Sequence, residues 1–175
     1  SLSPFVISVG ALIGHFSVES AEIIDGLDGL MIGVFGIIYA AFAVLLIVQG
    51  QYEYLPFLGI VLGIIVVDLY FNTPPARFFN GGPGTMPLGF SIFLIAILTN
   101  NIIPYFIITS ITWLDMLSSM LQIVSIQFFE KRVFKIAPVH HHFQALGWPE
   151  YKVVMRFWLF SVVSAIFGIY IGVIL

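Results

Sequence analysis

The stretch Leu30–Gln49, LMIGVFGIIYAAFAVLLIVQ, decides the fold class of this chain. It contains no charged residue, and its length matches the run of about 20 apolar residues that an α-helix needs to cross a bilayer. We therefore predict an all-α fold, a polytopic membrane helix bundle with about six transmembrane helices. The run 86–100 is short and follows Pro87, which predicts a tilted or broken helix there. The other apolar runs are 2–18, 55–71, 103–128 and 157–175.

The composition agrees with a membrane protein and excludes several other classes. Of the 175 residues, 60% are hydrophobic and 9% are charged, whereas soluble domains carry about 25% charged residues. The chain has no cysteine, which excludes disulfides and cysteine-based metal sites. The net charge of -3 and the lack of a basic stripe argue against nucleic acid as a partner. No internal repeat divides the chain, so residues 1–175 are predicted to form a single integral membrane domain.

The basic residues predict the orientation of the bundle. All six follow the third or the fifth predicted span, and the segments around 49–54 and 99–104 contain none. By the positive-inside rule, residues 19–29, 72–87 and 129–156 then form three cytoplasmic loops, and both termini are external. Most of the acidic, basic and histidine side chains fall in these loops, so an active site would face the cytoplasm. The basic residues are Arg77, Lys131, Arg132, Lys135, Lys152 and Arg156.

The first of these loops carries three acids close together, Glu22, Asp25 and Asp28. Because Asp25 and Asp28 are three residues apart, they would project from one face of the first turn if the second span began there. One interpretation is an ordinary helix start, where acids complement the helix dipole. The other is a site that holds a cation or accepts hydrogen bonds from a polar substrate.

The second loop belongs to the stretch Phe71–Thr85, FNTPPARFFNGGPGT. Its prolines and glycines are expected to end the third span and to leave a loop with exposed backbone amides. Such amides can cradle a phosphate group. An ordinary tight connection between two spans would have the same composition, so this loop taken alone leaves both interpretations open.

The third loop contains three adjacent histidines, His140, His141 and His142, preceded by the basic run 131–135. Adjacent histidines do not all point one way, and metal-binding pairs on a helix prefer i, i+4 spacing, so a zinc site is not favoured. Imidazoles beside lysine and arginine are suited to donating hydrogen bonds to phosphate oxygens. The basic run also has a plainer interpretation, which is contact with anionic membrane lipid.

Asp68 lies inside the third predicted span, where a charged carboxylate is costly. It should therefore face other helices or lie near the membrane interface. His15 in the first span is either its partner or a packing residue, and we favour packing. A small transporter would rest on these two residues alone, and the gathering of polar residues in one compartment argues against a transport pathway.

At this point the motifs resemble those of a known family. The run Lys131–Trp158, KRVFKIAPVHHHFQALGWPEYKVVMRFW, is similar to the last cytoplasmic loop of the phospho-N-acetylmuramoyl-pentapeptide transferases. The blocks Asp25–Leu30 and Phe71–Thr85 resemble two further blocks of this family in the same order. The resemblance implies a bundle of about ten membrane helices, of which this chain would supply the C-terminal six.

The resemblance also implies an activity and a location. Members of this family transfer phospho-MurNAc-pentapeptide from UDP-MurNAc-pentapeptide to undecaprenyl phosphate with Mg²⁺, which yields lipid I for peptidoglycan and releases UMP. The implied location is the bacterial inner membrane, with the active face in the cytoplasm. Family enzymes also form dimers, so a homodimer is an expected partner.

Matched position by position, the family resemblance assigns roles to eight residues. The catalytic group comprises Asp25 from the first block and the three histidines of the last block. The substrate-binding group comprises an aspartate at the nucleotide site, an asparagine that contacts uridine, an aromatic residue that stacks on uracil, and a lysine. In this sequence the catalytic group is Asp25, His140, His141 and His142, and the substrate-binding group is Asp28, Asn72, Phe79 and Lys131.

Two departures from the family pattern bear on catalysis. The family has a magnesium-binding aspartate where this chain has Gly82, and glycine offers no side-chain oxygen. The paired aspartates of an earlier cytoplasmic loop have no counterpart, which is expected of a fragment, a split enzyme, a deliberately shortened chain or an inactive homologue. Either Glu22 or Asp68 could supply a replacement carboxylate. The alternative function is a catalytically silent membrane protein that binds nucleotide or acts as a scaffold.

Overall fold

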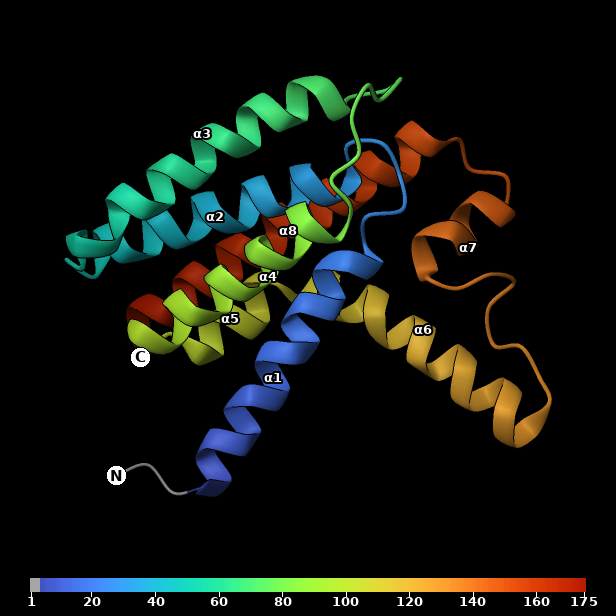
Figure 1. The fold of residues 1–175 in the computed structure, drawn as a ribbon, viewed down its shortest axis with the longest axis horizontal. Coiled ribbons are helices and arrows are strands. Elements are labelled where there is room, and N and C mark those ends of the chain that lie inside the picture. Colours follow the sequence, from blue (N-terminus) through green and yellow to red (C-terminus); the bar gives the residue numbers. More distant parts are fainter. Residues whose placement is uncertain (1–3) are drawn as a thin grey trace.

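The computed structural model describes residues 4–175, apart from the side chain of Val6. This part of the chain contains eight α-helices, one short 3-10 helix and no strand, which confirms the predicted all-α class (Figure 1). The helices are α1 (Pro4–Ile23), α2 (Leu30–Val48), η1 (Tyr52–Tyr54), α3 (Leu55–Asn72), α4 (Gly81–Leu98), α5 (Ile102–Ile108), α6 (Ser110–Phe129), α7 (Val139–Ala145) and α8 (Glu150–Ile174).

Several of these helices are able to cross a membrane. Among the described residues, α2, α4, α8 and the stretch Tyr52–Asn72 are long and apolar enough to do so, and α5 with α6 adds a fifth span if the bent pair counts as one. The predicted polytopic helix bundle is therefore confirmed. The first predicted span, residues 2–18, begins outside the described residues and continues into α1, where it stays a prediction.

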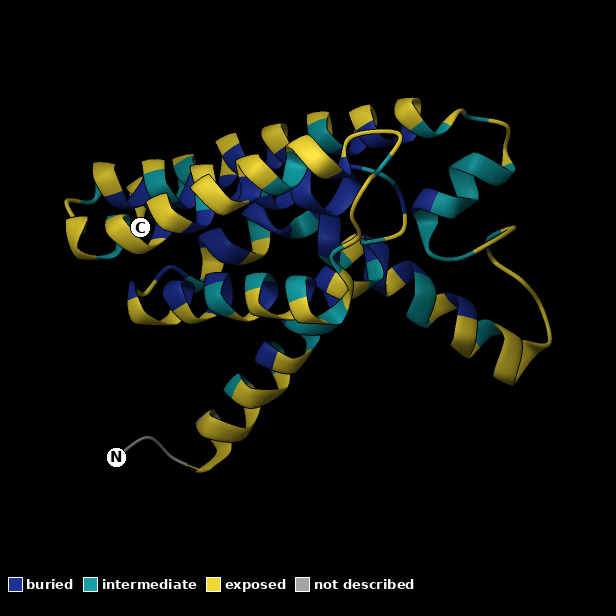
Figure 2. Ribbon diagram, turned by 45° about the horizontal axis from the view of Figure 1, so that its top comes forward, coloured by how far each residue is buried: buried dark blue, intermediate teal, exposed yellow. Residues whose placement is uncertain are grey.

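Helix α2 lies at the centre of the bundle, between α3 and α8. Large side chains along it, including Phe35, Phe42 and Leu45, are fully or almost fully buried. Helix α1 packs against α4 and α6, and α5 packs against α8. Figure 2 shows buried residues between the helices and exposed residues on their outer faces, and on α3 these exposed residues are apolar, as is expected where lipid surrounds a helix.

The break in the bundle does not fall where the sequence predicted it. Helix α4 is continuous through Pro87, whereas α5 and α6 meet at Thr109 with a bend of 70°. The Thr109 hydroxyl donates a hydrogen bond to the carbonyl of Tyr105, at 2.6 Å. Such bonds to the preceding turn compete with the backbone ladder and bend helices, which gives a physical reason for the break.

Helix α2 begins at Leu30, where the second span was predicted to start, so Asp25 and Asp28 lie in the irregular turn before it and do not share its first turn. The predicted start of the fourth span is wrong, because α4 begins at Gly81 and the loop after α3 is confined to residues 73–80. Pro83 fits this start because the first backbone N–H groups of a helix have no partner within the helix.

The connections between the helices gather at two opposite ends of the bundle (Figure 1). We call one the histidine end, and define it by the turn 24–29, the loop 73–80 and helix α7. We call the other the amide end, and define it by Gln49, Gln51, Thr99, Asn101 and Gly172, several of which share hydrogen bonds. The predicted active face corresponds to the histidine end.

Candidate functional site

The turn 24–29 is held in place from two sides. The backbone N–H of Asp28 donates to a carboxylate oxygen of Glu150 at the start of α8, at 2.9 Å. The Asp28 carboxylate accepts a hydrogen bond from the backbone N–H of Ala76, also at 2.9 Å. The indole N–H of Trp158 donates to the Gly29 carbonyl at 3.2 Å. Asp28, predicted to bind substrate, therefore connects the turn to the loop 73–80.

Asn72 joins the same two segments from inside the protein. It is 2% exposed, its side-chain oxygen accepts the Gly29 N–H at 2.8 Å, and its side-chain nitrogen donates to the Phe78 carbonyl at 2.7 Å. Both polar groups of Asn72 are thus occupied within the protein. Phe79 follows Phe78 in the sequence, and its side chain is 69% exposed. Its aromatic ring is therefore accessible beside the hydrogen bonds of Asn72.

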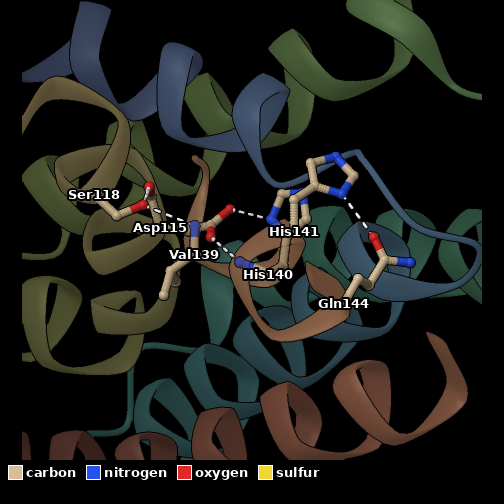
Figure 3. A network of polar contacts seen from close by, with 6 residues as sticks. All are labelled: Asp115, Ser118, Val139, His140, His141 and Gln144. Atoms are coloured by element: carbon tan, nitrogen blue, oxygen red, sulfur yellow. Dashed lines mark hydrogen bonds and ion pairs between the residues drawn. The ribbon is translucent and has the colours of Figure 1, made fainter. Parts of the chain in front are cut away.

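The three histidines occupy the short helix α7 and have different surroundings, which Figure 3 shows for His140 and His141. His140 is fully buried, and its ring nitrogen Nδ1 lies 2.7 Å from a carboxylate oxygen of Asp115 on α6. His141 is half-buried, with Nδ1 at 2.8 Å from the side-chain oxygen of Gln144. His142 accepts a hydrogen bond from the backbone N–H of Lys135 at 3.1 Å. The three imidazoles therefore have three different hydrogen-bond partners.

The histidine helix lies directly against the acidic turn, and Gly26 makes this approach possible. A Cβ atom at position 26 would collide with Nε2 of His140 and would lie 3.2 Å from Nε2 of His141. Only a residue without a side chain fits there without displacing the imidazoles. The structure therefore brings His140 and His141 next to Gly26, the residue after Asp25, although more than a hundred residues separate them in sequence.

The pKa of Asp25 is raised above its ordinary value. Burial raises the pKa of Asp25, a hydrogen bond from the backbone of Gly81 opposes the rise, and the nearby charge of Asp68 adds to it. The environment therefore favours the neutral form of this carboxyl group more than water does.

The residues present do not form a magnesium site by themselves. Within residues 4–175, no three histidine or acidic side chains are grouped so that they could hold a metal ion. A Cβ atom at Gly82 would lie 3.7 Å from a carboxylate oxygen of Glu22, so Glu22 reaches the place where a side chain at 82 would start. One exposed carboxylate does not supply the oxygen ligands that Mg²⁺ needs, so no reaction step is assigned to a metal here.

Of the remaining predicted residues, Asp68 lies near Asp25, whereas Lys131 follows α6 and His15 lies on α1. Lys131 follows the C-terminal end of α6, which projects away from the other helices in Figure 1, and its carbonyl accepts a local bond from Ser125. Asp68 interacts with Asn80 across the start of α4, while its Oδ1 atom has no hydrogen-bond partner among the described residues. His15 is exposed, and its ring centroid lies 5.7 Å from that of the next residue, Phe16, so its packing role stays a prediction.

Sequence reasoning missed two residues of this end, Asp115 and Glu150. Asp115 is an acid in the middle of a predicted span. An acid in such a position is costly, which is why the sequence analysis singled out Asp68, and the same reasoning applies to Asp115. Glu150 gave no such signal, because an acid in the first turn of a helix has an ordinary role in complementing the dipole.

The arrangement combines a free aromatic face, imidazoles with a nearby acidic turn, and a rigid hydrogen-bonded frame. Aromatic faces stack on bases, and protonated imidazoles donate hydrogen bonds to phosphate oxygens. A ligand that contains both a base and phosphate groups matches this combination. The side chains of the histidine end are therefore of the kinds that can bind a base and phosphate groups.

Comparison with known proteins indicates the same family as the sequence motifs do. Residues 2–100 match glycosyl transferase family 4. The phospho-N-acetylmuramoyl-pentapeptide-transferase of Anoxybacillus flavithermus is 42% identical over 155 residues, which are 89% of this chain and 48% of that protein. The enzyme of the same name from Bacillus subtilis is 39% identical over 169 residues, 97% of this chain and 52% of that protein. The chain spans about half the length of the curated relatives it matches, and the predicted resemblance is confirmed.

Proposed function

Because the chain belongs to glycosyl transferase family 4, we propose that it forms the nucleotide-facing part of a phospho-MurNAc-pentapeptide transferase. The donor is UDP-MurNAc-pentapeptide and the acceptor is undecaprenyl phosphate. The reaction takes place at the cytoplasmic face of the bacterial inner membrane, with both termini of the chain external. The names of the relatives and the positions of the basic residues support this proposal.

One observation carries the proposal. The three motif blocks, which are far apart in sequence, meet at the histidine end through the Gly29–Asn72 hydrogen bond and the close approach of His140 to Gly26. A structural role for each block separately would not require all three to meet. A shared ligand gives a reason for the meeting, and a sugar nucleotide has the groups that these side chains recognise.

In the proposed reaction, an oxygen of the lipid phosphate attacks the β-phosphorus of the UDP-sugar. A new P–O bond forms, the bond between the β-phosphorus and the UMP oxygen breaks, and UMP leaves with the electron pair. Such transfers depend chiefly on positioning and on neutralisation of charge. Phe79 would hold the uracil ring, His141 and His142 would donate to phosphate oxygens, and Asp25 would lie beside the reacting phosphates. Lys131 would contribute positive charge from the loop that follows α6.

The lack of a metal-ligand set among the described residues favours a second function, nucleotide binding without catalysis. Gly82 has no side chain, and the described residues offer no set of three metal ligands. A chain with this site could bind the nucleotide without transferring the sugar phosphate, as a silent member of the family. The Mg²⁺ of the family and a homodimer both remain expectations for this chain.

Two measurements on the purified chain in lipid nanodiscs separate these functions. Calorimetry with UDP-MurNAc-pentapeptide measures binding, and an assay with undecaprenyl phosphate and Mg²⁺ measures UMP release. Binding with UMP release supports the transferase, and binding without release supports the silent protein. Absence of binding contradicts both.

The variant Gly82→Asp sharpens this test. A carboxylate at position 82 would meet only the flexible end of Met86, at 3.2 Å from the new Cβ, and would stand beside Glu22. We expect this variant to release UMP faster than the wild type does. If Gly82→Asp binds the nucleotide and still releases no UMP, the catalytic assignment is wrong.

A further inference from the structure

The contact between Asp115 and His140 is the most deeply buried polar contact at the histidine end. Both side chains are 0% exposed. One carboxylate oxygen of Asp115 lies 3.2 Å from the backbone N–H of His140, and the other lies 2.7 Å from its ring nitrogen Nδ1 (Figure 3). The carboxylate of Asp115 therefore contacts His140 at two points, which fixes both the backbone and the ring plane of His140.

The surroundings of Nε2, the other ring nitrogen of His140, indicate which ring nitrogen carries the proton. Nε2 is buried and has no hydrogen-bond partner among the described residues, and it lies against the Gly26 backbone. A proton on Nε2 would be a buried donor without an acceptor, which is costly, whereas a bare lone pair is tolerated better. The proton therefore belongs on Nδ1, where the carboxylate of Asp115 accepts it.

We propose that Asp115 is a positioning residue of the histidine end, which holds His140 in the Nδ1–H tautomer and thereby seats α7 on the turn that contains Gly26. The relation is that of a carboxylate that orients an imidazole through its far nitrogen. His140 then serves as the fixed support of the motif. His141 is half-buried, its Nε2 has no hydrogen bond to the described residues, and it is the imidazole that faces a ligand.

Ser118 provides a matched comparison within the same interface. Its hydroxyl accepts the backbone N–H of Val139 at 2.8 Å, directly before His140. Ser118 therefore also ties α6 to α7, but it does not touch the imidazole. If Asp115 acted only by holding the two helices together, loss of either residue would have the same consequences.

The test uses the whole chain with ¹⁵N-labelled histidine, because only four histidines are present and each ring nitrogen reports its protonation. In the wild type, the resonance that disappears in His140→Gln should show a protonated Nδ1 and a bare Nε2. In Asp115→Asn, the new amide donates to Nδ1, so the proton should move to Nε2. Asp115→Glu should keep the wild-type tautomer, and so should Ser118→Ala.

The functional readout is UMP affinity, and this part rests on the proposed function. Asp115→Asn should weaken UMP binding by about tenfold, as for other residues that orient a functional histidine, while Ser118→Ala lowers the melting temperature and leaves UMP affinity nearly unchanged. A wild-type His140 with its proton on Nε2 would overturn the proposal without any ligand or variant. Equal losses of UMP affinity in both variants would also overturn it. Failure of the wild type to bind UMP counts against the proposed function, and the tautomer decides the role of Asp115 separately.

Discussion

The histidine end and the amide end are both polar caps on the same apolar bundle, yet their polar groups are used differently. At the amide end, Gln49 donates to Asn101 at 2.9 Å and to the Gly172 carbonyl at 2.7 Å, and Asn101 donates back to Gln49. At the histidine end, Asp68, Asn80 and His140 each keep a buried polar atom without a partner among the described residues.

This difference separates a structural cap from a site. Neutral amides that satisfy one another can close the end of a bundle without any ligand. Charged groups, imidazoles and unpartnered atoms cost stability and are retained where they serve function. In this bundle, the unpartnered buried polar atoms of Asp68, Asn80 and His140 lie at the end that carries the predicted site residues, and the amide end has none among the described residues.

The largest expected effect comes from Asn72→Ala. The change leaves the Gly29 N–H and the Phe78 carbonyl without partners, and each lost bond costs about 1–3 kcal/mol. Thermal unfolding should show a lower melting temperature, and calorimetry should show weaker UMP binding because Phe79 loses its support. Gln49→Ala at the amide end should lower the melting temperature and leave UMP affinity unchanged. Equal UMP affinities in the two variants would remove the distinction between the ends.

A smaller effect is expected from Gly33→Ala. A Cβ at this position would overlap the indole ring of Trp158, which also donates to Gly29, and overpacking costs about 1–3 kcal/mol. The melting temperature should fall, and the turn 24–29 should loosen. Gly59→Ala is the control, since a Cβ there meets nothing within 4 Å and alanine favours a helix. If both variants melt alike, Trp158 does not hold the turn.

Phe79→Ala should act on binding alone. The side chain is 69% exposed, so its loss should leave the melting temperature unchanged. Loss of base stacking should weaken UMP binding by about tenfold, which corresponds to about 1.4 kcal/mol. Tyr52→Ala, an aromatic of similar exposure on the other side of the bundle, is the control and should bind UMP normally. Normal UMP binding by Phe79→Ala would show that this ring does not face the base.

The smallest expected effect concerns the pH dependence of stability at Asp25. Because the folded protein raises the pKa of this acid, the folded state binds its proton more tightly than the unfolded state does, and stability falls as pH rises through the folded-state pKa. Asp25→Asn should therefore raise the melting temperature at neutral pH. The difference from the wild type should shrink as pH falls toward the ordinary value of 3.8. A difference that grows in acid would contradict the burial of Asp25.

The fold class and the meeting of the three motif blocks could be predicted from the sequence. Uninterrupted apolar runs leave few alternatives to membrane helices, and the basic residues mark the end of the bundle at which the polar loops gather. The break at Thr109 could not be predicted, because the bend depends on a side-chain bond to Tyr105 that many threonines in helices do not form. The start of α4 at Gly81 was missed because glycines and prolines suggested a loop.

The roles of individual site residues were harder to predict. The sequence names Asn72 as a polar residue at the end of a span, but its burial and its two internal bonds depend on the turn 24–29, which lies far away in sequence. The same holds for His140, whose partner Asp115 is on another helix. Residue type indicates what a side chain can bind, and only the packing shows which partner it has.

The central claim is that a nucleotide binds at the histidine end and that this end faces the cytoplasm. Because the chain has no cysteine, Phe79→Cys and Tyr52→Cys each introduce a single reactive position, one at the histidine end and one on the opposite side of the bundle. A membrane-impermeant maleimide added to inside-out vesicles should label Phe79→Cys and leave Tyr52→Cys unlabelled, and UMP should protect Phe79→Cys. Labelling of Tyr52→Cys from the cytoplasmic side, or labelling of Phe79→Cys that UMP does not slow, would contradict the account.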